Sequence, residues 1–420
     1  MREMKPSSME WVGDIPASWK VMPNKYLMYK KKEICPVYNG EDILSLTMKG
    51  VIVRDLDAGG KMPTSFDGYQ RLEPGNLLMC LFDIDVTPRC IGLIKQTGLS
   101  SPAYSQFVLC DNANAAYYCY YYTMLDNDKT LLHLAKNLRH SLTEDQLGAI
   151  PVIVPPMDEQ QRIADFLDVK CAEIDALTAD IQTQIDTLEQ YKRSVITETV
   201  TKGLNPNAEM RNSGIQWIGN MPSSWSVLKG KYMFAQRSLR GNSIELQLLS
   251  PTQKFGVIPQ TRYEELSGMN AVKLNEKADL SLFKTIHKGD FCISLRSFQG
   301  GFEYSEYEGV VSPAYQVFYP TVEIADGYYR YLFKEQGFIE KMNSYTMTLR
   351  DGKNIAFSDF GNTYIPYPPL TEQSEIAAYL NSKCAQINAL ITEKQQQLAT
   401  LDEYKKSLIF EYVTGKKEVV

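Results

Sequence analysis

The sequence predicts an α+β protein made of two tandem copies of one unit. In each copy a globular mixed α/β domain is followed by a long helix, and the two helices pair as an antiparallel coiled coil. Three observations predict this pseudo-two-fold arrangement. Motifs of the first half recur in order in the second, each half has strand-like runs closed by turn residues, and each ends in a long heptad-patterned stretch.

Five segments of the first half recur in the same order in the second half, with offsets of 206, 205, 211, 213 and 213 residues. This period is far too long for a solenoid repeat, so it indicates a duplicated domain with its helical appendage. The pairs are EMKPSSMEWVGDIPASW and EMRNSGIQWIGNMPSSW, LSLTMKGVI and LSPTQKFGVI, the two SPAY tetrads, KCAEIDAL and KCAQINAL, and LEQYKRSVI and LDEYKKSLI.

The globular part of each half is rich in Gly, Pro and Tyr and carries short apolar runs that favour strands. Two longer runs, AYYCYYYTML from Ala116 and GYYRYLFKEQGFIEKM from Gly327, fit amphipathic helices better. The predicted strands are NLLMCLF from Asn76, CIGLIK from Cys90, VIVP from Val152, DFCISL from Asp290 and VVSPAYQVFY from Val310.

Each half ends in a predicted long helix that starts after two prolines, with Asp158 and Thr371 as the expected N-caps. No Pro or Gly follows until Gly203 and Gly415, so each helix can run for about 42 residues, or about 63 Å. We therefore expect globular domains over residues 1–155 and 205–367, and helical parts over residues 156–204 and 368–420.

Apolar residues recur every seven positions along both helices, as in the seam of a coiled coil, with Lys170, Lys383 and Lys394 as interruptions. Two unrelated surface helices are the alternative. The helices can pair in either direction, and the approximate two-fold symmetry favours the antiparallel one. The predicted seam is Leu167, Ile174, Ile181, Leu188 and Val195 with Leu380, Ile387, Leu401 and Leu408, and a second column is Ile163, Leu177 and Tyr191 with Ile376, Leu390 and Tyr404.

The negative charge of the chain belongs to its helices. The formal net charge is −6, whereas residues 158–200 alone have ten acidic and four basic side chains, and residues 371–413 have six and four. The rest of the chain is net +2. A nucleic-acid partner is therefore compatible with the composition of the globular parts.

Most other function classes find little support. Eight cysteines without a C-x-x-C pair and only three histidines predict reduced structural thiols and no metal site. No apolar run could span a bilayer and the start lacks a signal-peptide core, which predicts a cytoplasmic protein with no membrane partner. Phosphate-binding, S-adenosylmethionine-binding and nuclease motifs are also missing, so the chain is predicted to be non-catalytic.

The repeated motifs form a set: PPMDEQQRIADFL and PPLTEQSEIAAYL start the helices, KCAEIDAL and KCAQINAL lie within them, and W-[VI]-G-x-[IM]-P-x-S-W opens each copy. This set resembles the specificity subunit of type I restriction–modification systems, end to end and in duplicate. The resemblance implies a DNA sequence-recognition subunit. Each globular domain would be a target-recognition domain that reads one half of a bipartite target in double-stranded DNA, and the paired helices would set the spacing. The two copies differ most in their basic residues, which predicts an asymmetric target.

The resemblance also implies partners. Two adenine-N6 methyltransferase (modification) subunits would dock on the paired helices, and restriction/translocase subunits would join them. S-adenosylmethionine, ATP and Mg²⁺ would be bound by those partners, and no cofactor would be bound by this chain.

Basic and amide side chains are the candidates for reading DNA, because Arg binds guanine bidentately and Gln binds adenine. A solvated or structural role is the alternative for each. Trp11, Trp19, Trp217 and Trp225 of the opening segments are predicted to pack, pinning each domain against the end of the preceding helix. The DNA-binding candidates are Lys49, Arg54, Arg71 and Arg139 in the first domain and Lys254, Arg262, Arg296, Gln299, Arg350 and Lys353 in the second.

Two other functions stay open from the residues alone. One is a duplicated coiled-coil scaffold whose globular domains bind protein or sugar, and the other is an enzyme with unrecognisable motifs. DNA binding that falls steeply with salt would exclude the scaffold, because neutralised phosphates release counterions. Turnover by the isolated chain would favour the enzyme.

Overall fold

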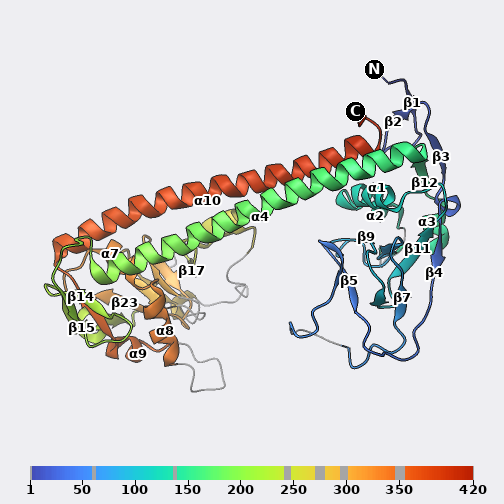
Figure 1. Cartoon of the computed structure of the whole chain (residues 1–420). Helices are drawn as coiled ribbons and strands as arrows, with labels where there is room; N and C mark the ends of the chain where they lie inside the picture. Colours follow the sequence, from blue (N-terminus) through green and yellow to red (C-terminus); the bar gives the residue numbers. More distant parts are fainter. Residues whose placement is uncertain are drawn as a thin grey trace. The chain divides into compact units, whose positions relative to one another are not determined.

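The computed structural model of the chain divides into two compact units, Met1–Gln182 with Gln396–Val420 (unit 1) and Thr183–Gln395 (unit 2). The division runs through both long helices, so each unit holds one globular domain with a stretch of each helix (Figure 1). The structure describes residues 2–58, 63–135, 140–240, 247–269, 280–293, 301–345 and 355–419.

Unit 1 contains a four-stranded antiparallel sheet in the order β4-β11-β8-β9 and four two-stranded ladders, β1–β2, β3–β12, β5–β6 and β7–β10. The predicted strands at Asn76, Cys90 and Val152 are confirmed as β8, β9 and β12. The bounds are β1 Met4–Pro6, β2 Asp14–Pro16, β3 Lys20–Pro23, β4 Met28–Lys31, β5 Leu44–Thr47, β6 Gly50–Val53, β7 Gln70–Leu72, β8 Leu77–Met79, β9 Ile91–Leu93, β10 Gly98–Ser100, β11 Ser105–Leu109 and β12 Pro151–Val154.

Unit 2 repeats this topology, with a sheet in the order β16-β23-β20-β21 and the ladders β13–β14, β15–β24, β17–β18 and β19–β22. The run predicted as one strand from Val310 is two, because the SPAY tetrad turns the chain between β22 and β23. The bounds are β13 Met210–Asn212, β14 Asn220–Pro222, β15 Ser226–Lys229, β16 Phe234–Arg237, β17 Leu249–Thr252, β18 Gly256–Pro259, β19 Lys284–Ile286, β20 Phe291–Ile293, β21 Phe302–Tyr304, β22 Gly309–Val311, β23 Gln316–Pro320 and β24 Tyr364–Tyr367.

Each unit also contains short helices. The predicted helix from Ala116 is confirmed as α1, whereas the run from Gly327 is two helices, α7 and α8, because the Glu335 carboxylate caps a new helix by accepting from the Phe338 N–H at 2.7 Å. The bounds are η1 Asn24–Tyr26, α1 Ala115–Asn127, α2 Thr130–Leu134 and α3 Glu144–Ala149 in unit 1, and α5 Gly230–Met233, α6 Gln260–Ser267, η2 Leu280–Leu282, α7 Asp326–Leu332, α8 Gln336–Ser344 and α9 Phe357–Asn362 in unit 2.

The two long helices are α4, Met157–Lys202, and α10, Leu370–Val413. They end where predicted, because Gly203 and Gly415 follow with φ of 76° and 69°. The predicted N-caps are wrong. Asp158 and Thr371 lie inside the first turn, since each helix begins directly after its second proline, whose fixed φ suits a helix start.

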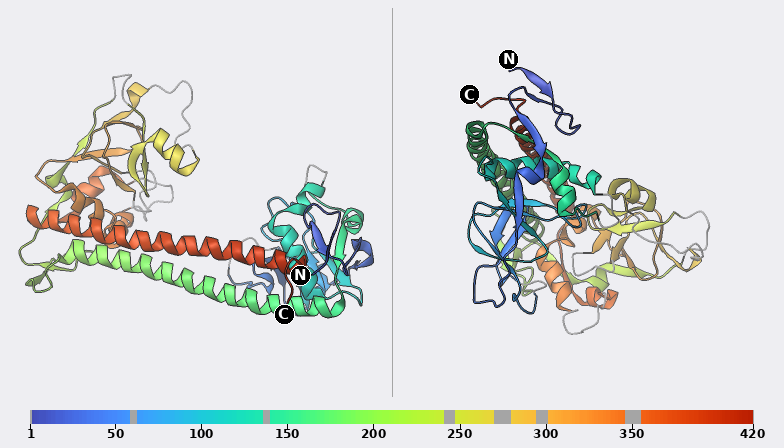
Figure 2. Two further views of the ribbon diagram at one scale, coloured as in Figure 1. Left: turned by 90° about the horizontal axis from the view of Figure 1, so that it is seen from above. Right: turned by 90° about the vertical axis from the view of Figure 1, so that its right-hand side faces the viewer.

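In each unit a stretch of α4 lies beside an antiparallel stretch of α10 (Figures 1 and 2). The Lys405 ammonium is 2.5 Å from an Asp175 carboxylate oxygen in unit 1, and the Lys192 ammonium is 2.7 Å from Asn388 Oδ1 in unit 2. Of the nine seam residues, Leu188 and Leu401 are half-buried, and the others are buried: Leu167, Ile174, Ile181, Val195, Leu380, Ile387 and Leu408.

The second predicted seam column is wrong for four residues, which are 46–54% exposed: Leu177, Tyr191, Leu390 and Tyr404. The buried column lies four residues after the first instead, at Cys171, Ile185 and Cys384. The globular domain decides this choice, because α1 packs on that side of α4 and its Tyr120 hydroxyl donates to Asp168 at 2.8 Å. A pattern along one helix does not reveal which flank a domain will cover.

The described residues contain no group of three or more His, Cys, Asp or Glu side chains that could hold a metal ion. None of the helices in this part of the chain is both long and apolar enough to cross a membrane.

Candidate nucleic-acid interface

Each unit presents a two-stranded hairpin built from the same repeated motif. LSLTMKGVI forms β5–β6 in unit 1, and LSPTQKFGVI forms β17–β18 in unit 2. Each hairpin has a threonine at the end of its first strand, paired with a glycine at the start of the second: Thr47 with Gly50, and Thr252 with Gly256. The two hairpins therefore lie at equivalent places in the repeat, with two residues at the tip in unit 1 and three in unit 2.

The threonine and glycine shape each tip. The hydroxyl of Thr47 donates to the Gly50 carbonyl at 3.0 Å and accepts from the Lys49 N–H at 3.1 Å. In unit 2 the Thr252 hydroxyl donates to the Gly256 carbonyl at 3.0 Å. Both glycines have a positive φ, 90° and 73°, which side-chain-bearing residues rarely adopt, so the tight turn depends on them.

Each tip carries an exposed lysine, Lys49 in unit 1 and Lys254 in unit 2, and Lys49 also lines a cavity between the hairpin and the helices α4 and α10. No described carboxylate lies within ion-pair distance of either, and the Lys254 ammonium lies 5.2 Å from the ring centroid of Phe255. Two unneutralised cations on equivalent tips are suited to phosphate or base contacts.

Three further candidates are described, and two of them already hold carboxylates. Arg71 in β7 lies 3.5 Å from Glu33, and Arg262 in α6 lies 2.9 Å from Glu265. Both pairs are exposed and therefore weak, so a phosphate can displace the carboxylate at small cost. Arg54 follows β6 and is half-buried. The remaining candidates lie outside the described residues: Arg139, Arg296, Gln299, Arg350 and Lys353.

Not every cation of the globular domains is available to DNA. The Arg89 guanidinium bonds the buried Asp126 at 3.2 Å. Arg237 donates to both carboxylate oxygens of buried Asp290, at 2.6 and 3.0 Å, and this hydrogen bonding raises the pKa of its guanidinium. These two arginines form ion pairs with buried carboxylates. The net positive charge of the domains is therefore larger than the number of basic side chains free to contact DNA would suggest.

The SPAY tetrads are structural turns in both units. In unit 1 the Gln70 side-chain amide donates to the carbonyls of Ser101 and Tyr104, at 2.9 and 2.8 Å. In unit 2 the Lys284 ammonium donates to the Tyr315 carbonyl at 2.6 Å, and burial lowers the pKa of this lysine. The two units hold the same turn with different side chains.

The opening segments fasten each domain to the helices. The indole N–H of Trp19 donates to Glu159 at 2.8 Å, and that of Trp225 donates to Glu372 at 2.8 Å, where both acceptors lie in the first turn of a long helix. Both indoles are at most 1% exposed, and Trp11 and Trp217 are half-buried. Burial in this way agrees with packing rather than with stacking on bases.

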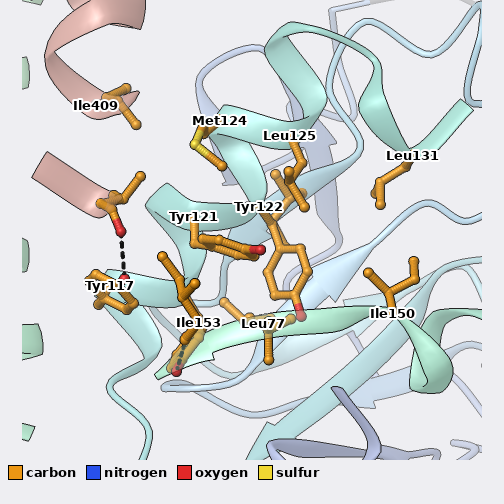
Figure 3. Close-up of a cluster of buried hydrophobic side chains, with 14 of the residues drawn as sticks. Leu77, Tyr117, Tyr121, Tyr122, Met124, Leu125, Leu131, Ile150, Ile153 and Ile409 are labelled. Carbon is orange, nitrogen blue, oxygen red and sulfur yellow. Dashed lines mark hydrogen bonds between the residues drawn. The ribbon is translucent and has the colours of Figure 1, made fainter. Parts of the chain in front are cut away.

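A tyrosine in each domain also holds the end of a long helix. The Tyr117 hydroxyl donates to the Val413 carbonyl of α10 at 2.7 Å (Figure 3). In unit 2 the Tyr328 hydroxyl donates to the Val200 carbonyl of α4 at 2.7 Å. These carbonyls belong to the last turn of a helix, where no later N–H can reach them, so a side chain that bonds them supplies the missing partner.

The prediction that each opening segment packs on the end of the preceding helix is confirmed in unit 2, where Gly203 lies against Trp225. In unit 1 it is the end of α10 that lies against the opening segment. A Cβ at Gly415 would come within 2.5 Å of Pro16, and the Lys416 ammonium donates to the Val12 carbonyl at 2.9 Å. The two chain ends lie close together in this unit (Figure 2).

Comparison with known proteins agrees with this architecture. The family model for the type I restriction modification DNA specificity domain matches residues 101–187 and 240–400. The MjaVIII type I restriction enzyme specificity subunit of Methanocaldococcus jannaschii is 26% identical over 287 residues, which are 64% of this chain and 63% of that protein. A second protein of that organism, assigned as the MjaX specificity subunit, is 23% identical over 66% of this chain and 62% of its own length. The chain thus covers less than two thirds of either relative.

Two solved structures share the fold. A chain of a type I R-M system whose complex assembly has been studied superposes with a TM-score of 0.68 at 14% identity, covering 96% of this chain and 99% of that one. The HsdS subunit from Thermoanaerobacter tengcongensis superposes with a TM-score of 0.50 at 14% identity, covering 98% of this chain and all of that one.

Proposed function

The chain belongs to the type I restriction modification DNA specificity family, and from this membership we propose that it is the sequence-reading subunit of a type I restriction–modification complex. Its two globular domains are target-recognition domains, each of which reads one half of a bipartite DNA target. The observation that carries this proposal is the repeated hairpin, which presents an exposed lysine at the same place in both units.

The differences between the two domains support an asymmetric target. At the hairpin tips, Met48 and Lys49 of unit 1 correspond to Gln253, Lys254 and Phe255 of unit 2. A shared lysine suits the phosphate backbone, which is the same everywhere, whereas different neighbours suit different base edges. The two halves of the target therefore differ in sequence.

The long helices support the roles of spacer and dock. α4 runs for 46 residues and α10 for 44, and neither contains a Pro or Gly, as a stiff spacer requires. Each unit also carries an exposed leucine and an exposed tyrosine on its helices, Leu177 with Tyr404 and Leu390 with Tyr191. Two equivalent sets of this kind suit two copies of one partner, the adenine-N6 methyltransferase subunit, and restriction/translocase subunits join that complex.

The division of chemistry follows from the same proposal. The chain is not an enzyme by itself and acts in the cytoplasm. S-adenosylmethionine, ATP and Mg²⁺ are bound by the partner subunits.

The test is to express the full chain with its modification subunit and map N6-methyladenine across the genome, with and without the chain. We expect methylation at one split sequence that disappears without the chain. Lys49→Ala should weaken or relax recognition of one half-site and Lys254→Ala of the other, with a salt slope smaller by about one unit for each lost phosphate contact.

Lys20→Ala is the matched control, because Lys20 is an exposed lysine on β3, away from the hairpin. It should leave the methylated sequence and the salt slope unchanged. Methylation that does not depend on the chain, or binding that is insensitive to salt, would overturn the proposal.

A further inference from the structure

The helix stretches around the two exposed apolar sets occupy equivalent positions in the repeat. In unit 1 they are residues 168–177 of α4 and 402–406 of α10, and in unit 2 they are residues 381–390 of α10 and 189–193 of α4. The antiparallel contact between the helices is also equivalent, Lys405 with Asp175 and Lys192 with Asn388. The two stretches can therefore be compared position by position.

Their charges have opposite sign. Among eight matched positions, unit 1 has five acidic and three basic side chains, a net of −2, whereas unit 2 has one acidic and three basic, a net of +2. The matched positions are Asp168, Lys170, Glu173, Asp175, Asp402, Glu403, Lys405 and Lys406 in unit 1, and Asn381, Lys383, Gln386, Asn388, Glu189, Gln190, Lys192 and Arg193 in unit 2.

At one of these positions the local structure does not require the difference in charge. The Tyr120 hydroxyl donates to the Asp168 carboxylate at 2.8 Å, and its counterpart Tyr331 donates to the Asn381 side-chain carbonyl at 2.9 Å. An aspartate and an asparagine thus accept the same bond in the two units. What changes is the charge that each unit presents to a partner.

The change extends to the flank with the exposed leucines. The Lys170 ammonium bonds the Glu173 carboxylate at 2.8 Å, a bond that raises the pKa of this lysine. Gln386 replaces the glutamate in unit 2, and the matching Lys383 ammonium lies 5.5 Å from the ring centroid of Tyr191. In unit 1 the lysine near the exposed leucine, Lys170, is thus neutralised by Glu173, whereas in unit 2 the matching Lys383 lies against the ring of Tyr191.

We propose that these two stretches are unequal docking sites for identical copies of the modification subunit, so that the copies bind in a fixed order. This inference rests on the function proposed above. Both sites receive the same partner surface, so whatever charge that surface carries is attracted by one site and repelled by the other. Salt screens both effects, which strengthens one site and weakens the other.

The experiment measures the two binding constants of the full chain for its modification subunit by native mass spectrometry and sedimentation, from about 0.05 M to about 0.5 M salt. At low salt we expect the constants to differ by roughly tenfold or more, so that the 1:1 complex accumulates before the 2:1 complex. At high salt the two constants should converge.

Charge swaps between the units are the matched variants, and each places in one unit the residues that the other already folds with. Asp168→Asn with Glu173→Gln and Asp175→Asn should bring the low-salt constants to within roughly twofold, because unit 1 then presents +1 beside +2. The reverse swap, Asn381→Asp with Gln386→Glu and Asn388→Asp, should equalise them as well.

Leu177→Asp and Leu390→Asp locate the sites, because each should remove one bound copy and leave the other with the salt dependence of the intact site. Equal constants at low salt in the unaltered chain, or swaps without effect, would overturn the inference and leave the proposed function standing. A chain that directs sequence-specific methylation in cells but binds no partner through these stretches would also overturn it. Loss of methylation dependence on the chain would overturn the proposed function itself.

Discussion

Unit 1 and unit 2 fill their cores with different aromatic chemistry around the same fold. In unit 1 the helix α1 contributes Tyr122, whose hydroxyl needs a partner and donates to Asn24 at 2.7 Å, where unit 2 has Phe333. Tyr118 of unit 1, which donates to the Ile153 carbonyl at 3.1 Å, is matched in unit 2 by Tyr329, which donates to the Pro366 carbonyl at 3.2 Å. Figure 3 shows the buried tyrosines of α1. The core of unit 2 uses a phenylalanine cluster that needs none. Its members include Phe234, Phe291, Phe318, Phe333 and Phe360.

The contacts that fasten each core to the helices are the same in both units. Trp19 with Glu159 matches Trp225 with Glu372, and Tyr117 with Val413 matches Tyr328 with Val200, each pair at equal distances. The glutamines that follow these glutamates also match, because Gln160 and Gln373 accept a backbone N–H at the start of α1 and before α7, at 2.8 and 2.9 Å.

This comparison shows which positions can vary in residue type between the two units and which cannot. A core needs volume and satisfied polar groups, so several aromatic combinations fill it equally well. A junction needs particular donors and acceptors at fixed places, so its residue types recur. The proposed function, in which two domains read different half-sites on one scaffold, would require variable cores and conserved junctions of this kind.

The largest expected effect on stability comes from removing the buried indole that fastens each domain to its long helix. Trp19→Ala and Trp225→Ala should each lower the free energy of unfolding by about 3–5 kcal/mol, because a fully buried indole leaves a cavity and an unbonded glutamate. Denaturant unfolding with hydrogen exchange of peptides from each unit would measure the loss. Exchange should rise in the altered unit, and unequal losses for the two variants would break the equivalence.

The second test concerns a carboxyl group that only unit 2 carries in its sheet. Burial raises the pKa of Glu303 to about 7, against the attraction of the neighbouring Lys334 ammonium. The matching position on β9 in unit 1 is Gly92. Because the folded pKa lies above the unfolded value of about 4.5, the protonated form is favoured by folding.

The sign of the resulting pH dependence follows from this shift. Between about pH 4.5 and 7 the folded unit 2 binds more protons than the unfolded chain, so its stability falls as pH rises through this range. Hydrogen exchange corrected for intrinsic rates should show this slope in unit 2, and Glu303→Gln should flatten it. An unchanged slope in the variant would assign the pH dependence to another group.

The smallest test concerns the two tyrosine hydroxyls at the helix ends. Tyr117→Phe and Tyr328→Phe should each lower the free energy of unfolding by about 1 kcal/mol, because each leaves a buried carbonyl without its donor. Tyr26→Phe is the control, since Tyr26 is 61% exposed and should change nothing measurable. A loss in only one of the two variants would show that the junctions differ in strength despite equal geometry.

Part of the candidate interface could be predicted from the sequence. Alignment of the repeats pairs Lys49 with Lys254, and the structure places both on equivalent hairpin tips. Composition alone could not separate these lysines from Arg89 and Arg237, which are cations of the same domains. Their buried carboxylate partners, Asp126 and Asp290, lie 37 and 53 residues away in sequence, so only folding brings them together.

The sequence by itself determined the duplication, the α+β class, the two long helices and where they end, because these depend on local pattern: repeated motifs, heptad spacing, and glycines that a helix cannot include without cost. Only the tertiary structure decided which flank of each helix is buried. Leu177 and Tyr191 fit a seam on the wheel of one helix, yet α1 covers the opposite flank of α4 and leaves Leu177 exposed. Burial depends on what packs against a residue, and that neighbour comes from a distant part of the chain.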